Sequence, residues 1–412
     1  MASDAHMVIV GAGLAGARAS AELREAGFDG PITLIGGEPH APYDRPPLSK
    51  AVLLKEKSPD DCALFGETFF ADRAIDLKLA ASVVEIDRAA RAVVLGNGER
   101  IGYSRLLIAT GASPRTLSVP GSELAGVVTL RTVDDARNLA TRLYQGQRVA
   151  IIGGGFIGLE VAASAVAAGC SVTVIEAGER LLMRAVPQEI SARIEVRHRS
   201  AGVQFRFGAR LVAIAGAGAA EEVRLADGEI IRCDTIVVGI GAAPRTALAK
   251  AAGLDVADGI VVDDRLCTSD AAIFAAGDVC SFPHALHGRR VRLECWKNAE
   301  DQGRIAGRNM LGENRRYREV PWFWSDQYEL SIQIAGFPAF GCETVVRETA
   351  DALLLFHLSV DGSLIAASGL GRTVGRDIRI AQMLIGRNAR LSTEELADPS
   401  VKLKSLLVAE AA

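Results

Sequence analysis

The chain has 412 residues, of which 49% are hydrophobic, and this length favours two or three domains with cores of ordinary size. Its net charge of −4 gives no bulk reason to expect nucleic-acid binding. No apolar run approaches the ~20 residues of a membrane-spanning helix, and the first strand pattern begins at Met7, too early for a signal peptide. We therefore expect a cytoplasmic protein that binds neither nucleic acid nor membranes.

The cysteines indicate the same compartment. There are 7, an odd number, and none forms a C-x-x-C pair, which favours reduced thiols over a disulfide framework or a metal cluster. His284 and His287 are spaced like a metal-binding pair, but no third ligand stands near them in the sequence. We expect a polar loop there and no metal site.

The first predicted strand leads into a glycine-rich turn, Val8–Gly16, with the pattern G-x-G-x-x-G. Val149–Gly158 repeats this arrangement of an apolar run, the same glycine spacing and the start of a helix. In dinucleotide-binding folds the glycines allow a tight turn, close approach of the backbone to pyrophosphate and close helix–strand packing, while the phosphates lie at the helix N-terminus. Two such motifs predict two nucleotides in one protein.

The elements after each motif also repeat. A helix pattern, a strand, an Asn-Gly or Asp-Gly hairpin and a buried strand ending in Gly and Pro follow in the same order. Residues 8–114 and 149–244 are therefore predicted to be two copies of one plan. The matching segments are Gly16–Gly27 and Gly158–Gly169, Pro31–Ile35 and Ser171–Glu176, Val93–Gly98 and Val223–Gly228, and Leu106–Pro114 and Ile236–Pro244.

After residue 244 the order of elements changes. Ile273–Val279 is typical of a strand ending in Gly-Asp, and Asn298–Met310 is typical of a helix. Strand patterns follow at Leu330–Ile334 and over Leu353–Ala367, and Asp377–Ile385 predicts a last helix. These features predict a separate C-terminal α+β domain.

Together these features resemble the FAD- and NAD-dependent flavoproteins with two dinucleotide-binding domains. The resemblance is carried by the two glycine motifs, by Ala109-Thr-Gly111 and by Phe274-Ala-Ala-Gly-Asp278. It implies an α/β fold with two Rossmann-like domains and a C-terminal α+β domain. The implied boundaries are a discontinuous FAD-binding domain (1–114 and 245–320), an NAD-binding domain (115–244) and a C-terminal domain (321–412).

Three further segments indicate a subgroup. Arg45–Lys50, Glu294–Glu300 and Pro321–Tyr328 together resemble the FAD-dependent ferredoxin reductases of oxygenase systems. Related disulfide reductases, oxidases and peroxidases carry redox cysteines shortly after the second strand, where this chain has no cysteine before Cys62. His357, the only histidine of the C-terminal domain, lies in a strand pattern and does not supply the acid–base histidine of the disulfide enzymes. We expect no storage of electrons on sulfur.

The resemblance assigns an FAD site. Lys50 is expected beside the flavin and paired with Glu160, and these two are the predicted catalytic residues. The strand end that usually carries an acid for the ribose has Gly36 instead, with Glu38 two residues later. The predicted FAD-binding residues are Gly11, Gly13, Leu14, Ala15, Gly16, Glu38, Arg45, Lys50, Val83, Ala109, Thr110, Gly111, Arg131, Gly277, Asp278, Trp296, Lys297 and Trp324.

The second nucleotide site carries its acid in the usual place. Glu176 ends the second strand of the later copy, where a carboxylate accepts hydrogen bonds from the adenine-ribose hydroxyls and repels a 2′-phosphate. Arg180 is the only base nearby, so we expect NADH rather than NADPH. The predicted NAD-binding residues are Gly153, Gly155, Phe156, Ile157, Gly158, Glu160, Glu176 and Gly241.

The implied function is transfer of electrons from NADH through FAD, one at a time, to a [2Fe–2S] ferredoxin that feeds an oxygenase, by a monomer or weak homodimer. Arg289, Arg290, Arg304 and Arg308 lie in an arginine-rich region and are expected to dock an acidic ferredoxin. Two alternatives stay open. One is an NADH oxidase, against which the missing redox cysteine argues. The other is an NADH-sensing signalling flavoprotein resembling apoptosis-inducing factor.

Overall fold

The computed structural model describes residues 5–286 and 288–409, and the chain within these bounds forms two compact units. The first unit contains residues 5–44, Asp60–Ser113 and Ala242–Glu319. The second contains Arg45–Pro59, Pro114–Gly241 and residues 320–409. His287, one half of the predicted loop pair, lies outside the described residues. Within them, no helix is long and apolar enough to cross a membrane.

A parallel five-stranded sheet forms the centre of the first unit, in the order β20-β7-β1-β2-β3. Its strands β1 and β2 are buried along their whole length, which explains their unbroken apolar sequences. The register pairs Met7 with Ile32 on one side and with Arg105 on the other. The bounds are β1 Met7–Val10, β2 Ile32–Ile35, β3 Ile75–Lys78, β7 Arg105–Ile108 and β20 Ile273–Ala275.

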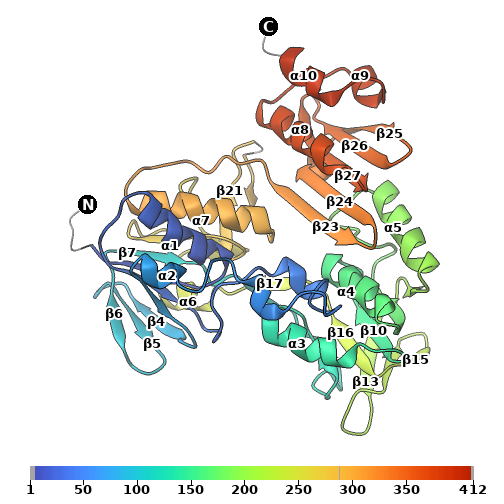
Figure 1. Ribbon diagram of the computed structural model, residues 1–412, viewed down its shortest axis with the longest axis horizontal. Helices are drawn as coiled ribbons and strands as arrows, with labels where there is room; N and C mark the ends of the chain where they lie inside the picture. The colour runs from blue at the N-terminus through green and yellow to red at the C-terminus, as the bar shows by residue number, and fades with distance from the viewer. Residues whose placement is uncertain (1–4, 287, 410–412) are drawn as a thin grey trace. The chain divides into compact units, whose positions relative to one another are not determined.

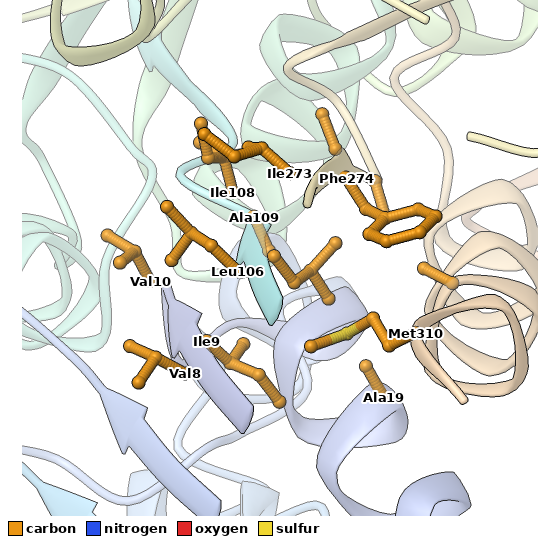
Figure 2. Close-up of a cluster of buried hydrophobic side chains, with 14 of the residues drawn as sticks. Val8, Ile9, Val10, Ala19, Leu106, Ile108, Ala109, Ile273, Phe274 and Met310 are labelled. Carbon is orange, nitrogen blue, oxygen red and sulfur yellow. The ribbon is translucent and has the colours of Figure 1, made fainter. Parts of the chain in front are cut away.

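Helices α1 (Leu14–Glu25) and α7 (Trp296–Met310) lie side by side against this sheet (Figure 1). The contact is close because glycines of α7 face the backbone of α1. A Cβ atom at Gly303 would lie 2.3 Å from the Ala15 carbonyl oxygen, and one at Gly307 would lie 2.9 Å from that of Ala19. Figure 2 shows Met310 of α7 beside Ala19 of α1, in the core built on β1, β7 and β20.

The remaining elements of the first unit are short. An antiparallel meander of β4, β5 and β6 lies between β3 and β7 in the chain, as its Asn-Gly turn predicts. The elements are α2 Phe69–Asp72, β4 Val83–Asp87, β5 Ala92–Leu95, β6 Arg100–Gly102, β17 Ala242–Pro244, α6 Ala247–Ala251, β18 Val256–Ala257, β19 Gly259–Val261, β21 Cys280–Pro283 and β22 Arg290–Val291, with a 3₁₀ turn at Pro59–Cys62 and the short strand β8 Ala112–Pro114 at the unit boundary.

The second unit repeats this plan. Its parallel sheet has the order β12-β11-β10-β16-β9, and the antiparallel meander is formed by β13, β14 and β15. The elements are η1 Pro46–Ser49, β9 Val127–Val128, α3 Val133–Arg142, β10 Arg148–Ile152, α4 Phe156–Ala167, β11 Ser171–Ile175, α5 Gln188–Ser200, β12 Gln204–Arg206, β13 Leu211–Ala215, β14 Glu222–Leu225, β15 Ile230–Arg232 and β16 Thr235–Val238. The predicted repeat and fold class are confirmed.

The second unit also contains the C-terminal α+β region. An antiparallel sheet of order β23-β24-β27-β26-β25 is covered by α8, and the predicted last helix lies inside α8. The elements are β23 Trp322–Gln327, β24 Leu330–Gly336, η3 Pro338–Phe340, β25 Glu343–Glu348, β26 Ala352–Leu358, β27 Leu364–Gly371, α8 Gly375–Gly386, α9 Thr393–Ala397 and α10 Leu403–Ala409. The division into three domains remains a prediction.

Candidate functional site

The first glycine motif forms a turn that only glycine fits at two of its positions. Gly11 has a φ of +114°, and a Cβ there would lie 2.1 Å from the Ala109 carbonyl oxygen. A Cβ at Gly16 would lie 2.0 Å from the Gly11 carbonyl oxygen. The turn therefore packs β1, β7 and α1 together without side chains between them.

The middle glycine leaves an open cradle at the start of α1. Gly13 is the N-cap residue, and a Cβ there would meet no protein atom within 4 Å. No side chain caps the helix and its first turn, which starts at Leu14 and Ala15, carries no acidic residue. The free N–H groups and the helix dipole suit an anion at this point. The cradle fits the pyrophosphate of a dinucleotide.

The Gly-Asp strand end lies against the same turn. Gly277 has a φ of +81°, and a Cβ there would come within 3.1 Å of the Ala15 methyl group. Asp278 follows directly, so the fold brings this carboxylate's backbone next to the start of α1. Gln302 of α7 accepts the Gly277 N–H at 2.8 Å, and its Nε2 is buried with no partner among the described residues. Such a donor fits a polar ligand, and no sequence motif marked Gln302.

The two candidates for the ribose end of this site are arranged differently from the usual pattern. Gly36 directly follows β2, and a Cβ there would lie 2.8 Å from the Ala12 Cβ, so Ala12 leaves no room for a side chain at this position. Glu38 lies beyond it and accepts a hydrogen bond from the Tyr43 hydroxyl at 2.5 Å. The acid is thus held in place from outside the strand, and its role toward a ribose stays a prediction.

Other predicted FAD residues of the first unit have defined partners. The Trp296 indole N–H donates to Asp44 at 2.7 Å, and Lys297 Nζ contacts Asp301 at 2.6 Å. Burial lowers the pKa of Lys297, but its contacts with Asp301 and Glu300 outweigh burial and raise this pKa above its ordinary value. Further predicted members lie close to the core or the turn, namely Val83, Ala109, Thr110 and Gly111.

The second glycine motif has the same geometry in the second unit. Gly153 has a φ of +107°, and a Cβ there would lie 2.5 Å from the Gly239 carbonyl oxygen. A Cβ at Gly158 would lie 2.3 Å from the Gly153 carbonyl oxygen. Gly155 is the N-cap of α4, which has no side-chain cap and no acid in its first turn, so a second anion cradle is formed.

Glu176 lies at the end of β11, as predicted. Its carboxylate accepts the N–H groups of Gly154 and Gly178, both at 2.6 Å. These two bonds fix the carboxylate at the edge of the cradle and leave lone pairs on both oxygens. Gly154 makes room for this acid, because a Cβ at 154 would lie 3.1 Å from Glu176 Oε2.

Arg180, the one base near Glu176 in sequence, is engaged elsewhere. Its guanidinium donates to the carbonyl oxygens of Leu181, Met183 and Val186 and to the Ser191 hydroxyl. It therefore closes its own loop and supplies no phosphate clamp, which favours NADH. Of the other predicted NAD residues, Phe156 packs on Phe323 with ring centroids 4.3 Å apart, Ile157 is exposed, and Gly241 has a φ of +96° with open space around it.

The predicted catalytic pair is formed. Lys50 Nζ lies 3.0 Å from Glu160 Oε1, and the Ser49 hydroxyl donates to Glu160 Oε2. Glu160 is only 5% exposed, so its carboxylate depends on these donors. Pro46 and Pro47 set the 3₁₀ turn that delivers Ser49 and Lys50 to α4.

Three other predicted FAD residues lie in the second unit. Arg45 donates to the backbone carbonyl of Arg131, and the N–H of Arg131 donates to Asp135, which belongs to the capping box of α3. Trp324 stacks on Trp322 with ring centroids 4.9 Å apart and an interplanar angle of 16°. The structure thus gives each of these residues a local position, and their contact with a flavin stays a prediction.

The predicted docking arginines are only partly available. Arg290 donates to the backbone carbonyls of Val262 and Ser281, and Arg308 forms an ion pair with Glu22 at 2.5 Å. Arg304 has a half-exposed side chain and a looser contact with Glu300 at 3.4 Å. Of the four, Arg289, Arg290 and Arg304 are the exposed members.

The cysteines form no disulfide, and all seven lie within the described residues. Burial raises the pKa of Cys233 and of Cys295 to about 12, and raises that of Cys280 further. These thiols stay protonated at neutral pH and are poor nucleophiles. The expectation that no electrons are stored on sulfur stays a prediction.

Comparisons with known proteins agree with this geometry. The family model "Pyridine nucleotide-disulphide oxidoreductase" matches residues 5–303, and "Reductase C-terminal" matches residues 322–407. Since the first match covers more than half of the chain, the protein belongs to the pyridine nucleotide-disulphide oxidoreductase family.

The similar proteins are more specific. The ferredoxin–NAD(+) reductase component of the anthranilate 1,2-dioxygenase system of Burkholderia cepacia is 43% identical over 407 residues, which are 97% of this chain and 98% of that protein. Rhodocoxin reductase of Rhodococcus erythropolis is 40% identical, over 97% of this chain and 93% of that one. The solved covalent putidaredoxin reductase–putidaredoxin complex matches with a TM-score of 0.95 at 33% identity, covering 99% of each chain. The predicted resemblance to ferredoxin reductases of oxygenase systems is confirmed.

Proposed function

We propose that this protein is an NADH:ferredoxin oxidoreductase that uses FAD and passes electrons one at a time to a [2Fe–2S] ferredoxin, which in turn feeds an oxygenase. The observation that carries the proposal is the pair of open glycine cradles at Gly13 and Gly155, one of which has Glu176 at its edge. With two nucleotide sites and no thiol relay expected, we infer that the two cofactors exchange electrons directly.

The first cradle is the proposed FAD site. The turn at Gly11, Gly13 and Gly16 would hold the pyrophosphate, and Asp278 and Gln302 would hold the polar chain of the cofactor. FAD, when bound, takes up an electron pair and releases electrons singly. No acid–base side chain is needed for that exchange, so the protein's part is to bind, orient and tune.

The second cradle is the proposed NADH site. Gly153, Gly155 and Gly158 would hold the pyrophosphate, while Glu176 would accept the adenine-ribose hydroxyls and exclude a 2′-phosphate. Lys50 supplies a cation that Glu160 holds in a fixed position. We propose that this ammonium lies beside the flavin and stabilises negative charge there.

The partner is proposed to be an acidic ferredoxin of the [2Fe–2S] type, met by a surface that includes Arg304. The relatives' names mention ferredoxin, and the solved complex contains putidaredoxin. We further propose that the protein acts in the cytoplasm as a monomer or weak homodimer. The proposed domains remain 1–114 with 245–320 for FAD, 115–244 for NADH, and 321–412.

A ferredoxin-dependence assay tests the function. We expect NADH-driven reduction of cytochrome c to depend strongly on added [2Fe–2S] ferredoxin. Rapid peroxide formation without ferredoxin would favour the oxidase alternative. Slow turnover with a long-lived charge-transfer absorption between nucleotide and flavin would favour the signalling alternative.

A further inference from the structure

A buried chain of polar side chains ends on the Glu160 carboxylate. The Ser325 hydroxyl lies 2.6 Å from Glu160 Oε1, and Gln327 Nε2 lies 3.1 Å from that hydroxyl. Gln327 Oε1 lies 2.9 Å from His198 Nε2. Ser325 and His198 are 0% exposed and Gln327 is 1% exposed. The chain joins α4, β23 and α5 inside the second unit. Ser325 and Gln327 belong to the segment Pro321–Tyr328, whereas His198 belongs to no motif of the sequence.

The hydrogen-bond directions in this chain follow from the chemistry of its ends. A carboxylate can only accept, so Ser325 donates to Glu160, and the Ser325 oxygen in turn accepts from the Gln327 amide N–H. The Gln327 carbonyl then faces His198, which must carry its proton on Nε2. His198 Nδ1 is left as an acceptor, and the Tyr328 hydroxyl lies 3.1 Å from it. All four donors therefore point toward Glu160.

The far end of the chain is held under backbone strain. Tyr328 lies in the two-residue turn between β23 and β24 and has a φ of +55°, which is unfavourable for an aromatic residue. Arg197 compensates by placing its guanidinium carbon 3.9 Å above the Tyr328 ring and by pairing with Glu329 at 2.8 Å. Helix α5 thus clamps the turn and aims the Tyr328 hydroxyl at His198.

The His198 imidazole is suited to connect Gln327 and Tyr328 in its neutral form. Burial lowers the pKa of His198 and outweighs the Gln327 hydrogen bond, which raises it, while the nearby Arg197 guanidinium makes a smaller lowering contribution. Burial likewise raises the pKa of Tyr328 to about 12, which keeps its hydroxyl protonated as a donor. Apolar residues would fill the same volume without ordering five polar groups, so packing alone does not explain this chain.

We propose that His198 and Gln327 are positioning residues of the reaction, which fix Ser325 as a donor to Glu160 and thereby hold the Lys50 ammonium in place. The inference rests on the proposed function, because that function gives Lys50 its place beside the flavin. According to this inference, the turn between β23 and β24 helps to position Lys50 and Glu160, although it lies far from Lys50 in the sequence.

The decisive variant is Gln327→Glu, which keeps the shape of the side chain and reverses one bond. A carboxylate at this position accepts from both His198 and Ser325, so the Ser325 proton is drawn away from Glu160. We expect the rate of FAD reduction at saturating NADH, measured by anaerobic stopped flow in the holoprotein, to fall about tenfold. The NADH concentration that gives half of this rate should stay unchanged.

His357→Gln is the matched control. His357 is also buried in the second unit, at 3% exposure, but its ring contacts Thr344 and Ser368 and has no link to Glu160. This variant should reduce FAD at the wild-type rate. A Gln327→Glu protein with the wild-type rate, or a His357→Gln protein slowed as much, would overturn the proposal.

A second measurement does not depend on the activity of any variant. Nitrogen-15 NMR of the histidine side chains, with the His198 signal identified by its loss in His198→Gln, reports the ring tautomer. We expect the Nε2–H tautomer in the wild-type holoprotein, and an Nδ1–H tautomer would contradict the inference alone. A wild-type protein that NADH does not reduce would instead overturn the proposed function and this inference with it.

Discussion

In the first copy of the nucleotide-binding plan, α1 packs its small residues against α7, whereas in the second copy α4 buries Glu160 in its first turns. The two positions correspond, since Arg18 and Glu160 each come two residues after the last glycine of their motif. Arg18 lies 5.1 Å from the Phe65 ring and 3.4 Å from Glu300, and Glu160 pairs with Lys50. The two copies thus share one backbone arrangement but carry opposite charges at the equivalent positions Arg18 and Glu160. The residues around each position determine its role.

The two copies also differ at the carboxyl end of their second strands. In the first copy Ala12 fills the space above the strand end, which must then be Gly36. In the second copy Gly154 leaves that space empty, and Glu176 occupies the strand end and takes two backbone N–H groups. The two copies therefore differ both at the strand end and at the residue inside the glycine motif that faces it.

The largest effects are expected from adding one methyl group to the glycine turn of either copy. Gly11→Ala and Gly153→Ala both place a Cβ within 2.5 Å of a carbonyl oxygen at a positive φ, a strain of several kcal/mol. We expect Gly11→Ala to be purified without flavin absorbance. Gly153→Ala should keep its flavin and lose NADH binding, as titration calorimetry would show.

Gly66→Ala is the control for these variants, because a Cβ there meets no atom within 4 Å and the φ is ordinary. It should bind both nucleotides like the wild type. Loss of both nucleotides in Gly153→Ala, with the fold intact by circular dichroism, would contradict a separate role for the second copy.

A buried histidine makes the stability of the unit that contains the second copy depend on pH. Burial lowers the pKa of His357 from its ordinary 6.5 to about 4, so the unfolded chain binds a proton more readily than the folded protein. The contribution is fully present above about pH 6.5 and is lost as the pH falls toward 4, by roughly 3 kcal/mol in total. Urea unfolding of wild type and His357→Gln over this range measures it.

The variant should show a flatter decline of the unfolding free energy with falling pH. Equal slopes for the two proteins would show that His357 titrates normally in the folded state.

The paired strand ends can be tested by exchange. Gly36→Glu alone should destabilise the first unit by about 2 kcal/mol, because its Cβ would lie 2.8 Å from that of Ala12. Adding Ala12→Gly restores the arrangement of the second copy and should recover most of the loss. Thermal unfolding of the single and double variants forms the required cycle, and additive effects would refute the coupling.

The smallest expected effect concerns partner docking. Arg304→Glu reverses an exposed arginine of the predicted docking set, and we expect the ferredoxin reduction rate to fall a few-fold at low salt, with a smaller difference at high salt. Arg232→Glu, at an exposed position of the second unit, is a charge-matched control. Equal rates in Arg304→Glu and wild type at low salt would remove Arg304 from the interface.

Much of the fold could be predicted because the signals were local. Glycine spacing and apolar runs marked both copies of the plan, and Asn-Gly and Asp-Gly turns marked both meanders. Strands β24, β26 and β27 and helix α8 followed from alternation and helical periodicity. Strands β23 and β25 and the short helices α9 and α10 were not predicted.

Residues of the candidate site could be predicted only where they belong to a motif of a known family. Lys50 and Glu160 were paired by resemblance, but Ser49, Ser325, Gln327 and His198 meet through contacts that span more than a hundred residues. The Ala12–Gly36 complement likewise depends on two separate elements. Ser49, Ser325 and Gln327 lie in segments that carried the resemblance, but nothing in the sequence indicated that they meet near Glu160. His198 lies in no such segment, and nothing indicated that Ala12 faces Gly36, because only the fold brings these residues to their partners.

The most direct test of the account is an anaerobic titration of the holoprotein and an excess of [2Fe–2S] ferredoxin with NADH, followed by absorbance. The account predicts two ferredoxin molecules reduced for each NADH consumed, because one electron pair is divided by the flavin between single-electron carriers. NADH that is consumed without reduced ferredoxin, or a ferredoxin that stays oxidised while the flavin is fully reduced, would contradict it.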